Sequence, residues 1–308
     1  MIRYLAMRAI HGVIVIFLVT TLVFAILHLA PGDPVTVLVG EAKMTNAQLA
    51  QIRHFWGLDQ PAYLQYFHWL GNMARGDFGT SIVADGRSVS SLLLDAAPNT
   101  LQLNVLALLL SIAVAFPAGC LAAIKRNSIY DGGLMVLSTL GVSIPSFWLG
   151  LMLIILFSAK LGWLPAFGQA DWRSYVMPVF VLAAEGMALL ARLVRASTLE
   201  VMAQEYVTTA RSKGLSEGVV MLRHVVRNSL LPVVTVLGLH IGFLLSGTIV
   251  IETVFAWPGI GRLLFQSITE RDCQVVQANV LLGAVVVVLV NLTIDLIYAY
   301  IDPRIRYR

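Results

Sequence analysis

Residues 205–216 read EYVTTARSKGLS and lie between two long apolar segments of the chain. The first part of this run favours a helix, Gly214 interrupts it, and Ser216 is placed as the N-cap of a second helix. Glu217 follows in the first turn of that helix, where a carboxylate is favoured by the positive end of the helix dipole. We therefore predict two short helices at an angle, which form a rigid knob that another protein can grip.

The composition around this knob is that of a membrane protein. The chain is 58% hydrophobic and 12% charged, against about 25% charged residues in soluble domains. An ordinary cytosolic enzyme is therefore excluded. A membrane-spanning helix needs roughly 20 apolar residues, and six segments qualify: 9–30, 101–124, 132–158, 176–195, 230–256 and 275–301. The sequence predicts an all-α integral membrane protein with six transmembrane helices.

The basic residues predict how these helices are oriented. With the N-terminus inside, 13 of the 21 Lys and Arg residues fall on the cytosolic side and 8 on the external side, as the positive-inside rule requires. The pI near 9.2 is thus explained by orientation, because the charges are dispersed among the spans and predict no nucleic-acid site. We expect a multi-pass membrane protein with both termini cytoplasmic, the tail being residues 303–308.

The N-terminal residues 1–30 resemble a secretory signal in having a basic start and an apolar core. The apolar run is longer than the usual 7–15 residues of such a signal, and Pro31 would follow any cleavage site at once. We therefore predict an uncleaved first span. Cys120 falls in the second span and Cys273 in the last external loop, so no disulfide is expected.

Residues 31–98 form the one sizeable segment that is too polar to be a span. Thr45 with Gln48 predicts a capping box before one short helix, and Asp59 is expected to cap a second. Tyr63, Tyr66, Phe67 and Leu70 would share one face of that second helix, and a turn-rich segment follows near residues 79–81. This external insertion could meet a substrate-delivery protein or guide substrate inward; the alternative is a simple spacer.

Several chemical motifs are missing from the sequence. None of the four lysines follows a glycine, so the chain has no P-loop of the Gly-x4-Gly-Lys type and any ATP chemistry must come from another chain. The histidines show no metal-ligand spacing, and no cofactor, metal or enzyme activity is predicted. An ion-coupled carrier would use acidic groups within the membrane, for which Glu185, Glu252 and Asp295 are the candidates. Only Glu185 is expected to lie deep.

The knob resembles the "EAA" loop of permease subunits in type I ABC importers. Aligned on Gly214, the Glu-Ala-Ala positions hold Thr208, Thr209 and Ala210, so the acidic residue of the general pattern is missing. Gly214 also lies farther from Pro232 than in sugar permeases. Both departures are similar to the peptide-permease branch, which carries a tyrosine-valine-x-threonine-alanine-arginine-x-lysine-glycine run. The alternative is a solvated basic loop that merely obeys the positive-inside rule.

Further motifs extend this resemblance along the chain. In order, they are LAPGDP at 29–34, GLDQP at 57–61, RGDFGTS at 75–81, SIPSF at 143–147, GWLP at 162–165, ETVFAWPGIG at 252–261 and DPRIRY at 302–307. The long insertion after the first span resembles the "B" permease of dipeptide and oligopeptide systems. The resemblance implies a type I permease fold whose core covers residues 99–302, with the coupling loop at about 196–229.

The resemblance also implies partners and roles. The partners are a second permease subunit in a heterodimer, two ABC ATPase subunits, an extracytoplasmic solute-binding protein, the lipid bilayer and a peptide substrate. The residues implied to couple to the ATPase are Thr208, Thr209, Ala210, Arg211, Lys213, Gly214, Leu215 and Arg223. The candidates for a gate or cavity are Pro145, Glu185, Glu252, Trp257 and Pro258.

Most of these roles have structural alternatives. The basic residues of the knob could anchor inner-leaflet lipid, and Trp257 with Pro258 could belong to an interfacial aromatic belt. Glu252 or Glu185 could attract the amino group of a peptide, or have a structural partner such as Arg262 or a backbone amide. The resemblance implies ATP-driven import of dipeptides or short oligopeptides, with nickel or glutathione as other cargoes; an ion-coupled carrier and a membrane scaffold or sensor are the remaining alternatives.

Overall fold

A computed structural model of the chain describes residues 2–29, 48, 51, 54, 59–81, 83–84, 86–230, 233 and 248–301, with the backbone alone at 2–6 and 294–301. Most of the predicted first external helix near residue 45, most of the predicted 230–256 span and the 303–308 tail lie outside these residues. The chain divides into two compact units, Met1–Asn99 with Gly259–Arg308, and Thr100–Pro258. Each unit is described by itself.

The described residues are almost entirely helical, and five of the six predicted spans correspond to helices. Four helices are long and apolar enough to cross a membrane: Met7–Leu29, Val89–Ile124, Arg173–Met202 and Cys273–Thr293. A fifth crossing arises if the bent pair Ile129–Ser143 and Ser146–Lys160 acts as one span. The helix containing the predicted second span begins at Val89, well before residue 99, and its 36 residues extend about 54 Å, beyond the roughly 30 Å of hydrocarbon.

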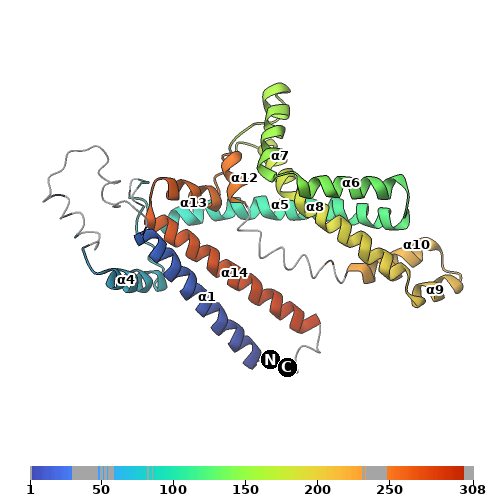
Figure 1. Ribbon diagram of the computed structural model, residues 1–308, viewed down its shortest axis with the longest axis horizontal. Helices are drawn as coiled ribbons and strands as arrows, with labels where there is room; N and C mark the ends of the chain where they lie inside the picture. The colour runs from blue at the N-terminus through green and yellow to red at the C-terminus, as the bar shows by residue number, and fades with distance from the viewer. Residues whose placement is uncertain are drawn as a thin grey trace. The chain divides into compact units, whose positions relative to one another are not determined.

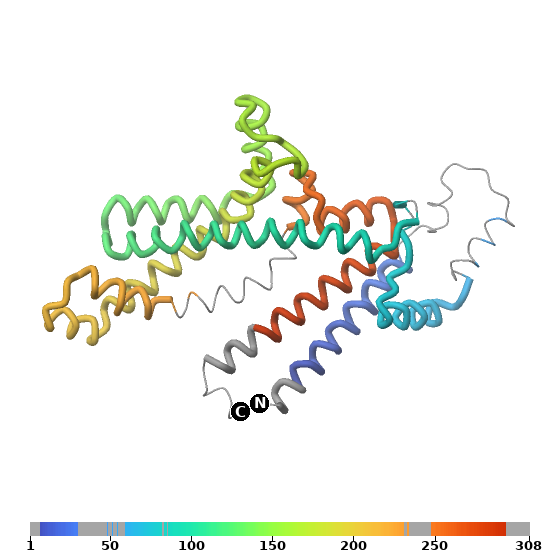
Figure 2. Tube along the Cα trace, turned by 180° about the vertical axis from the view of Figure 1, so that it is seen from behind, coloured from blue at the N-terminus to red at the C-terminus, as the bar shows by residue number. Residues whose placement is uncertain are grey.

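In the first unit, α1 (Ile2–Leu29) and α14 (Cys273–Ile301) lie side by side (Figures 1 and 2). They approach closely at Gly12, where an added Cβ would lie 2.5 Å from Cγ1 of Val288. The amphipathic helix α13 (Ile260–Thr269) also packs on α14. The first residues of α5 (Val89–Ile124) complete this unit.

The second predicted external helix is present as α4 (Ala62–Ala74), with two corrections. Its N-cap is Pro61, not Asp59. The predicted common aromatic face is divided, because Tyr66 is buried against α1 whereas Tyr63 and Phe67 are 64% and 61% exposed. The buried face of α4 is therefore centred on Tyr66 and Met73.

A buried polar contact ties the external turns to the start of α14. Ser81 donates its hydroxyl hydrogen to a carboxylate oxygen of Asp272 at 2.5 Å, and the other oxygen of Asp272 accepts from the backbone N–H of Val275 at 3.3 Å. The turn-rich segment predicted near residues 79–81 is present, since Gly76 and Gly79 both have positive φ. The contact fixes where the chain enters α5.

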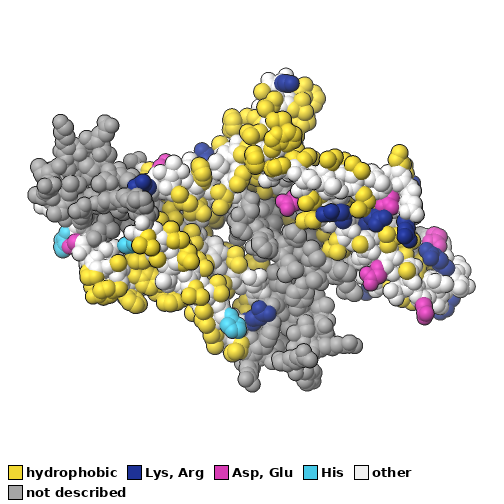
Figure 3. Space-filling model, in the orientation of Figure 1, with side chains coloured by type: hydrophobic (Ala, Val, Ile, Leu, Met, Phe, Trp, Pro, Cys, Tyr) yellow, Lys and Arg dark blue, Asp and Glu magenta, His cyan; other side chains and the backbone are white. Residues whose placement is uncertain are grey.

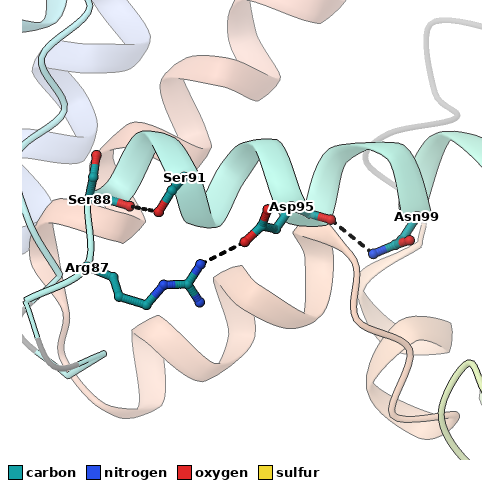
Figure 4. A network of polar contacts seen from close by, with 5 residues as sticks. All are labelled: Arg87, Ser88, Ser91, Asp95 and Asn99. Carbon is teal, nitrogen blue, oxygen red and sulfur yellow. Dashed lines mark hydrogen bonds and ion pairs between the residues drawn. The ribbon is translucent and has the colours of Figure 1, made fainter.

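The start of α5 carries a surface network, drawn in Figure 4. Arg87 and Asp95 form an ion pair at 2.7 Å. Nearby, the backbone carbonyl of Ser88 accepts a hydrogen bond from the hydroxyl of Ser91. Asn99 donates its amide to the backbone carbonyl of Asp95 at 3.1 Å. Because both charged groups are more than half exposed, this pair contributes little to stability, and it marks a part of α5 that is polar rather than apolar.

In the second unit, small residues let α8 (Arg173–Met202) pack closely on α5 and on α6 (Ile129–Ser143). A Cβ added at Gly119 of α5 would lie 2.6 Å from the backbone oxygen of Ala191. One added at Gly141 of α6 would lie 2.9 Å from the Cβ of Ala188. These glycines act as packing positions, as is common between membrane helices.

The predicted third span is broken rather than merely kinked. α6 ends at Ser143, and α7 (Ser146–Leu153), which continues as the π-helix η1 (Ile154–Lys160), leaves at an angle of 100°. Ile144 and Pro145 at the break have extended backbone, since the residue before a proline avoids helical angles. The packing of α7 on α8 and on α12 (Ile249–Val254) then directs it away from α6.

An ion pair joins the other end of α6 to α8. Arg195 donates through its Nε and Nη2 to the two carboxylate oxygens of Asp131, the second contact being 2.8 Å. The same carboxylate accepts the backbone N–H of Asn127, which has φ +60°. The side chain of Asp131 is only 6% exposed, so this two-pronged contact satisfies a buried charge as well as joining the helices.

We expect Gly119→Ala to lower the stability of the purified protein, because the methyl group collides with the backbone of α8 and overpacking costs about 1–3 kcal/mol. Gly133→Ala in α6 is the matched control, since its Cβ meets nothing within 4 Å and alanine favours helix. Thermal unfolding followed by tryptophan fluorescence in detergent compares the two. Equal midpoints would contradict the close approach.

Candidate functional site

The knob predicted from residues 205–216 is present. α9 (Glu205–Ser212) follows α8, and after a turn the short helix α10 (Glu217–Val219) runs into the π-helix η2 (Val220–Val226). Figure 1 shows α9 and α10 together beyond the end of α8. The sequence thus located the helix, the break and the second helix, although not the π character of the last part.

The knob has a small apolar core of its own. Val207 and Ala210 on α9 pack against Val220, Met221 and Val225, and the end of α8 closes the cluster. Three of these side chains, those of the valines, have no accessible surface. Such a cluster packs α9, η2 and the end of α8 against one another.

The bend depends on one backbone conformation. Gly214 has φ +80°, and a Cβ there would meet nothing within 4 Å. The constraint is therefore conformational rather than one of space, since side chains disfavour left-handed φ by roughly 1–2 kcal/mol. Across the bend, Arg211 forms an ion pair with Glu217 at 2.7 Å. Ser216 occupies the predicted N-cap position, but its side chain makes no capping hydrogen bond.

The outer surface of the knob mixes charge with apolar groups. Of the coupling candidates, Ala210 is buried, and the remaining seven are exposed: Thr208, Thr209, Arg211, Lys213, Gly214, Leu215 and Arg223. Large apolar side chains stand among them, with Leu222 74%, Tyr206 43% and Val219 42% exposed. A surface that combines basic and apolar groups in this way can bind another protein.

α8 separates the knob from a second cluster of candidates. Its 30 residues extend about 45 Å, enough to cross the bilayer, with the knob at its C-terminal end. Tyr175, near the opposite end, contacts Trp257 edge-to-face, with ring centroids 4.6 Å apart. The knob and the Trp257 cluster therefore lie at opposite ends of α8.

Glu252 is at the centre of this second cluster. Its side chain has no accessible surface, and its carboxylate accepts the hydroxyl hydrogen of Thr100 at 2.7 Å. The carboxylate is fully enclosed. A buried carboxylate needs such hydrogen bonds to offset its desolvation, so the contact with Thr100 is structural.

The residues after Glu252 form a tight turn that encloses Trp257. The backbone N–H of Trp257 donates to the carbonyl of Glu252 at 2.7 Å, with Ala256 at φ +49° between them. Trp257 has no accessible surface, so it is not part of an interfacial aromatic belt. Tyr175, which contacts its ring, donates its hydroxyl hydrogen to Gln102 at 3.1 Å.

The remaining gate candidates are not gathered into this cluster. Pro258 and Pro145 are exposed, the latter at the break between α6 and α7. Glu185 is exposed on α8, twelve residues from its N-terminal end. Thr100, Gln102 and Tyr175 were missed by sequence reasoning. A polar pair at the start of an apolar span was the available signal for Thr100 and Gln102.

Two models of known protein families match the chain. A model of the family described as "Binding-protein-dependent transport system inner membrane component" matches residues 115–307, and the N-terminal model of such components matches residues 1–104. The chain belongs to this family. It is a transport permease, and the family supports the inner membrane as its location.

Two relatives align with the permease over their whole length. The glutathione transport system permease protein GsiC of Escherichia coli K12 is 41% identical over 309 residues, with all of both chains covered. The oligopeptide transport system permease protein AppB of Bacillus subtilis is 40% identical over 317 residues, again with both chains fully covered. These names confirm the predicted peptide-permease family.

A solved structure supports the fold. The crystal structure of an amino acid ABC transporter with histidines contains a chain that matches with a TM-score of 0.52 and 18% identity. The match covers 68% of the permease and 93% of that chain. At this identity the similarity shows the helical architecture alone, and it confirms the predicted permease fold.

We expect Gly214→Ala to loosen the bend of the knob, whereas Gly218→Ala, equally open but without positive φ, leaves it intact. A strain of 1–2 kcal/mol raises the locally unfolded fraction about 5–30-fold. Tryptic cleavage after Arg211 or Lys213, timed by mass spectrometry, reports that fraction. Identical cleavage rates in the two variants would show that the bend does not depend on glycine.

Thr100→Val is expected to destabilise the second unit, because it removes a donor from a buried carboxylate at nearly constant volume. Losing such a partner costs about 1–3 kcal/mol. Thr139→Val is the control, because the Thr139 hydroxyl bonds only back to the Met135 carbonyl of its own exposed helix face. Denaturation midpoints of the two variants give the measurement, and a smaller loss for Thr100→Val than for Thr139→Val would count against the Glu252 contact.

Proposed function

We propose that this permease is a membrane-spanning subunit of an ATP-driven importer that carries short peptides into the cell. The main support for this proposal is the full-length similarity, at 40–41% identity, to one relative named for oligopeptides and another named for glutathione. Glutathione is itself a tripeptide, so the two names describe related cargo. Dipeptides, short oligopeptides and glutathione form the proposed substrate class.

The knob is proposed to dock on an ABC ATPase subunit, which supplies the energy that this chain cannot. Its closed apolar core and its contact with the end of α8 support a mechanical role, because movement of the knob is transmitted as a rigid unit. Lys213, Leu215 and Arg223 present the charge and the apolar surface for the contact. Arg211 is held by Glu217 within the knob, so we assign it to shape rather than to direct contact.

The topology proposed has the knob and both termini in the cytoplasm. The basic residues beside the predicted inner ends of the spans support this orientation. The segment 31–98 then lies outside, residues 99–302 form the permease core, and the Trp257 cluster lies at the outer end of α8. Solute-binding protein would deliver peptide on that outer side.

The cavity is proposed to lie between this chain and a second permease subunit. Glu185 supports the proposal, since it is exposed on a spanning helix about 18 Å from one end. An unpaired carboxylate facing lipid at that depth costs roughly 2.5–3.5 kcal/mol. The face that bears it is therefore better placed against a partner or a water-filled path, where it can attract the amino group of a peptide.

Pro145, Trp257 and Pro258 are proposed to shape the outer gate. The enclosed Trp257 forms its fixed part, because its ring is buried against Tyr175. Pro145 sets the 100° break that turns α7 onto α12. The ring of each of the two exposed prolines fixes its backbone φ, so the chain is locally rigid at both positions.

Uptake by the reconstituted complex in proteoliposomes tests the energy source and the cargo together. Labelled dipeptide, tripeptide and glutathione should accumulate with internal ATP, and a hydrolysis-dead ATPase partner should abolish uptake, whereas a proton ionophore should leave it intact. Loss of uptake with the ionophore alone would identify an ion-coupled carrier instead. Absence of any peptide uptake by an active ATPase complex would reject the cargo class.

The docking role is tested by cysteine cross-linking in inner-membrane vesicles. Leu222→Cys on the knob should cross-link to an ATPase subunit, whereas Trp172→Cys, 72% exposed just before α8, should not. An ATPase cross-link at position 172 with none at position 222 would reverse the proposed topology. A knob without ATPase contact would remove its proposed role.

A further inference from the structure

We propose that the exposed face of α4 binds the lipid of the leaflet farther from the N-terminus, so that α4 is an interfacial membrane helix rather than part of a water-exposed insertion. In the topology proposed above, on which this statement of the side rests, that is the outer leaflet. The argument comes from the depth at which α4 contacts α1, from the side chains it exposes and from the charges that flank it.

α4 is held along the outer half of α1, not at its end. The ring of Tyr66 contacts Phe24 and Phe17 with centroids 5.1 and 6.3 Å away, and its hydroxyl lies 2.8 Å from that of Thr21. Counting from Leu29, the last residue of α1, Phe24 is about 8 Å and Phe17 about 18 Å down the helix axis. Figures 1 and 2 both show α4 beside this part of α1.

The C-terminal half of α4 lies at the same depth. Met73 packs in a buried cluster with Val275 and Ala278 near the start of α14. Because α14 is antiparallel to α1 and Val288 faces Gly12, Val275 lies about 20 Å along from that contact, level with the Phe24 region of α1. Both ends of the buried face of α4 are thus within the apolar length of α1.

This depth matches hydrocarbon or its boundary. The Met7–Leu29 span is 23 residues, or about 34 Å, against a hydrocarbon thickness of roughly 30 Å. The span can therefore cross the bilayer only if nearly all of it is immersed. A helix that lies beside residues 17–28 of that span is then in the far leaflet.

The exposed face of α4 has the chemistry of such a position. Tyr63, Leu64 and Phe67 are 64%, 37% and 61% exposed, and the helix contains no Asp, Glu, Lys or Arg. In Figure 3 hydrophobic side chains cover α1 and α4 as one continuous surface. Tyrosine and other aromatic side chains are favoured where hydrocarbon meets headgroups, and amphipathic helices lie at this boundary.

Charges and backbone contacts at the ends agree with this position. Asp59 precedes α4, and Arg75 and Asp77 follow it, so both ends can reach water while the helix between them is uncharged. At the N-terminal end of α4, the carbonyl of Pro61 accepts the backbone N–H of Leu64. At the other end, the backbone N–H of Arg75 donates to the carbonyl of Asn72. Helical backbone bonding of this kind permits immersion, because lipid supplies no hydrogen bonds.

The consequence is that α4 fixes the depth of the segment that leads into α5. The external turns after α4 are tied to α14 through Ser81 and Asp272, and α4 adds a lipid anchor before them. The described part of the insertion is then partly a membrane element, and its polar turns after α4 face the aqueous side.

Spin-label accessibility tests the proposal in the assembled importer, reconstituted in lipid nanodiscs after Cys120→Ala and Cys273→Ala. A nitroxide at Phe67→Cys, or one turn earlier at Tyr63→Cys, should collide with oxygen in preference to the water-soluble Ni-EDDA. The reference is Asp95→Cys, whose carboxylate is 69% exposed on the polar start of α5. The oxygen-to-nickel collision ratio at positions 63 and 67 should exceed that at 95 several-fold.

The outcomes separate the possible occupants. A ratio at both positions equal to that at position 95 means that the face is in water, and the proposal fails. Labels shielded from both reagents, or cross-links from position 67 to the second permease or the binding protein, mean that protein covers the face, and the proposal also fails. The side is read separately: if an impermeant maleimide labels Asp95→Cys only from the cytoplasmic side, the proposed topology is wrong while lipid contact can still be scored.

Discussion

Backbone amides within a bilayer have no water to bond, and this constraint governs how the permease can be built. Every segment within the apolar layer must satisfy its own N–H and C=O groups, so the spans are helices and shape can be adjusted only where helices meet or end. Close approach is set by the glycines, such as Gly119 beneath α8 and Gly12 beside α14. Among the described residues, the chain changes direction at the break at residues 144–145 and at turns such as that at Ala256.

Within that frame, three buried carboxylates connect helices to each other or to turns. Asp272 accepts a hydrogen bond from Ser81, Glu252 accepts one from Thr100, and Asp131 accepts one from Arg195. Each lies in a place where an unsatisfied charge would cost several kcal/mol, so each fixes its partner in position. Hydrophobic contacts alone cannot do this among membrane helices, because lipid is as apolar as the side chains.

The knob is stabilised differently from the spans, since it is a small structure with a packed core of its own. Its core of Val207, Ala210 and Val220 is sealed by the end of α8, and its bend depends on left-handed backbone at Gly214. Rigidity of this kind is what a mechanical contact requires. The helix that carries the knob at one end, α8, holds Tyr175 against Trp257 at the other.

The sequence by itself determined the membrane class, the positions of five of the six predicted spans and the knob, because apolar length and the glycine break are local properties. It also located Glu252 and Trp257 through their motif. It could not show that Glu252 accepts a hydrogen bond from Thr100, that Trp257 is packed on Tyr175, or that Tyr66 of α4 is buried while Phe67 is exposed. Those features depend on which helices become neighbours, and residues such as 100 and 252 are brought together only by tertiary packing, for which no local pattern exists in the chain.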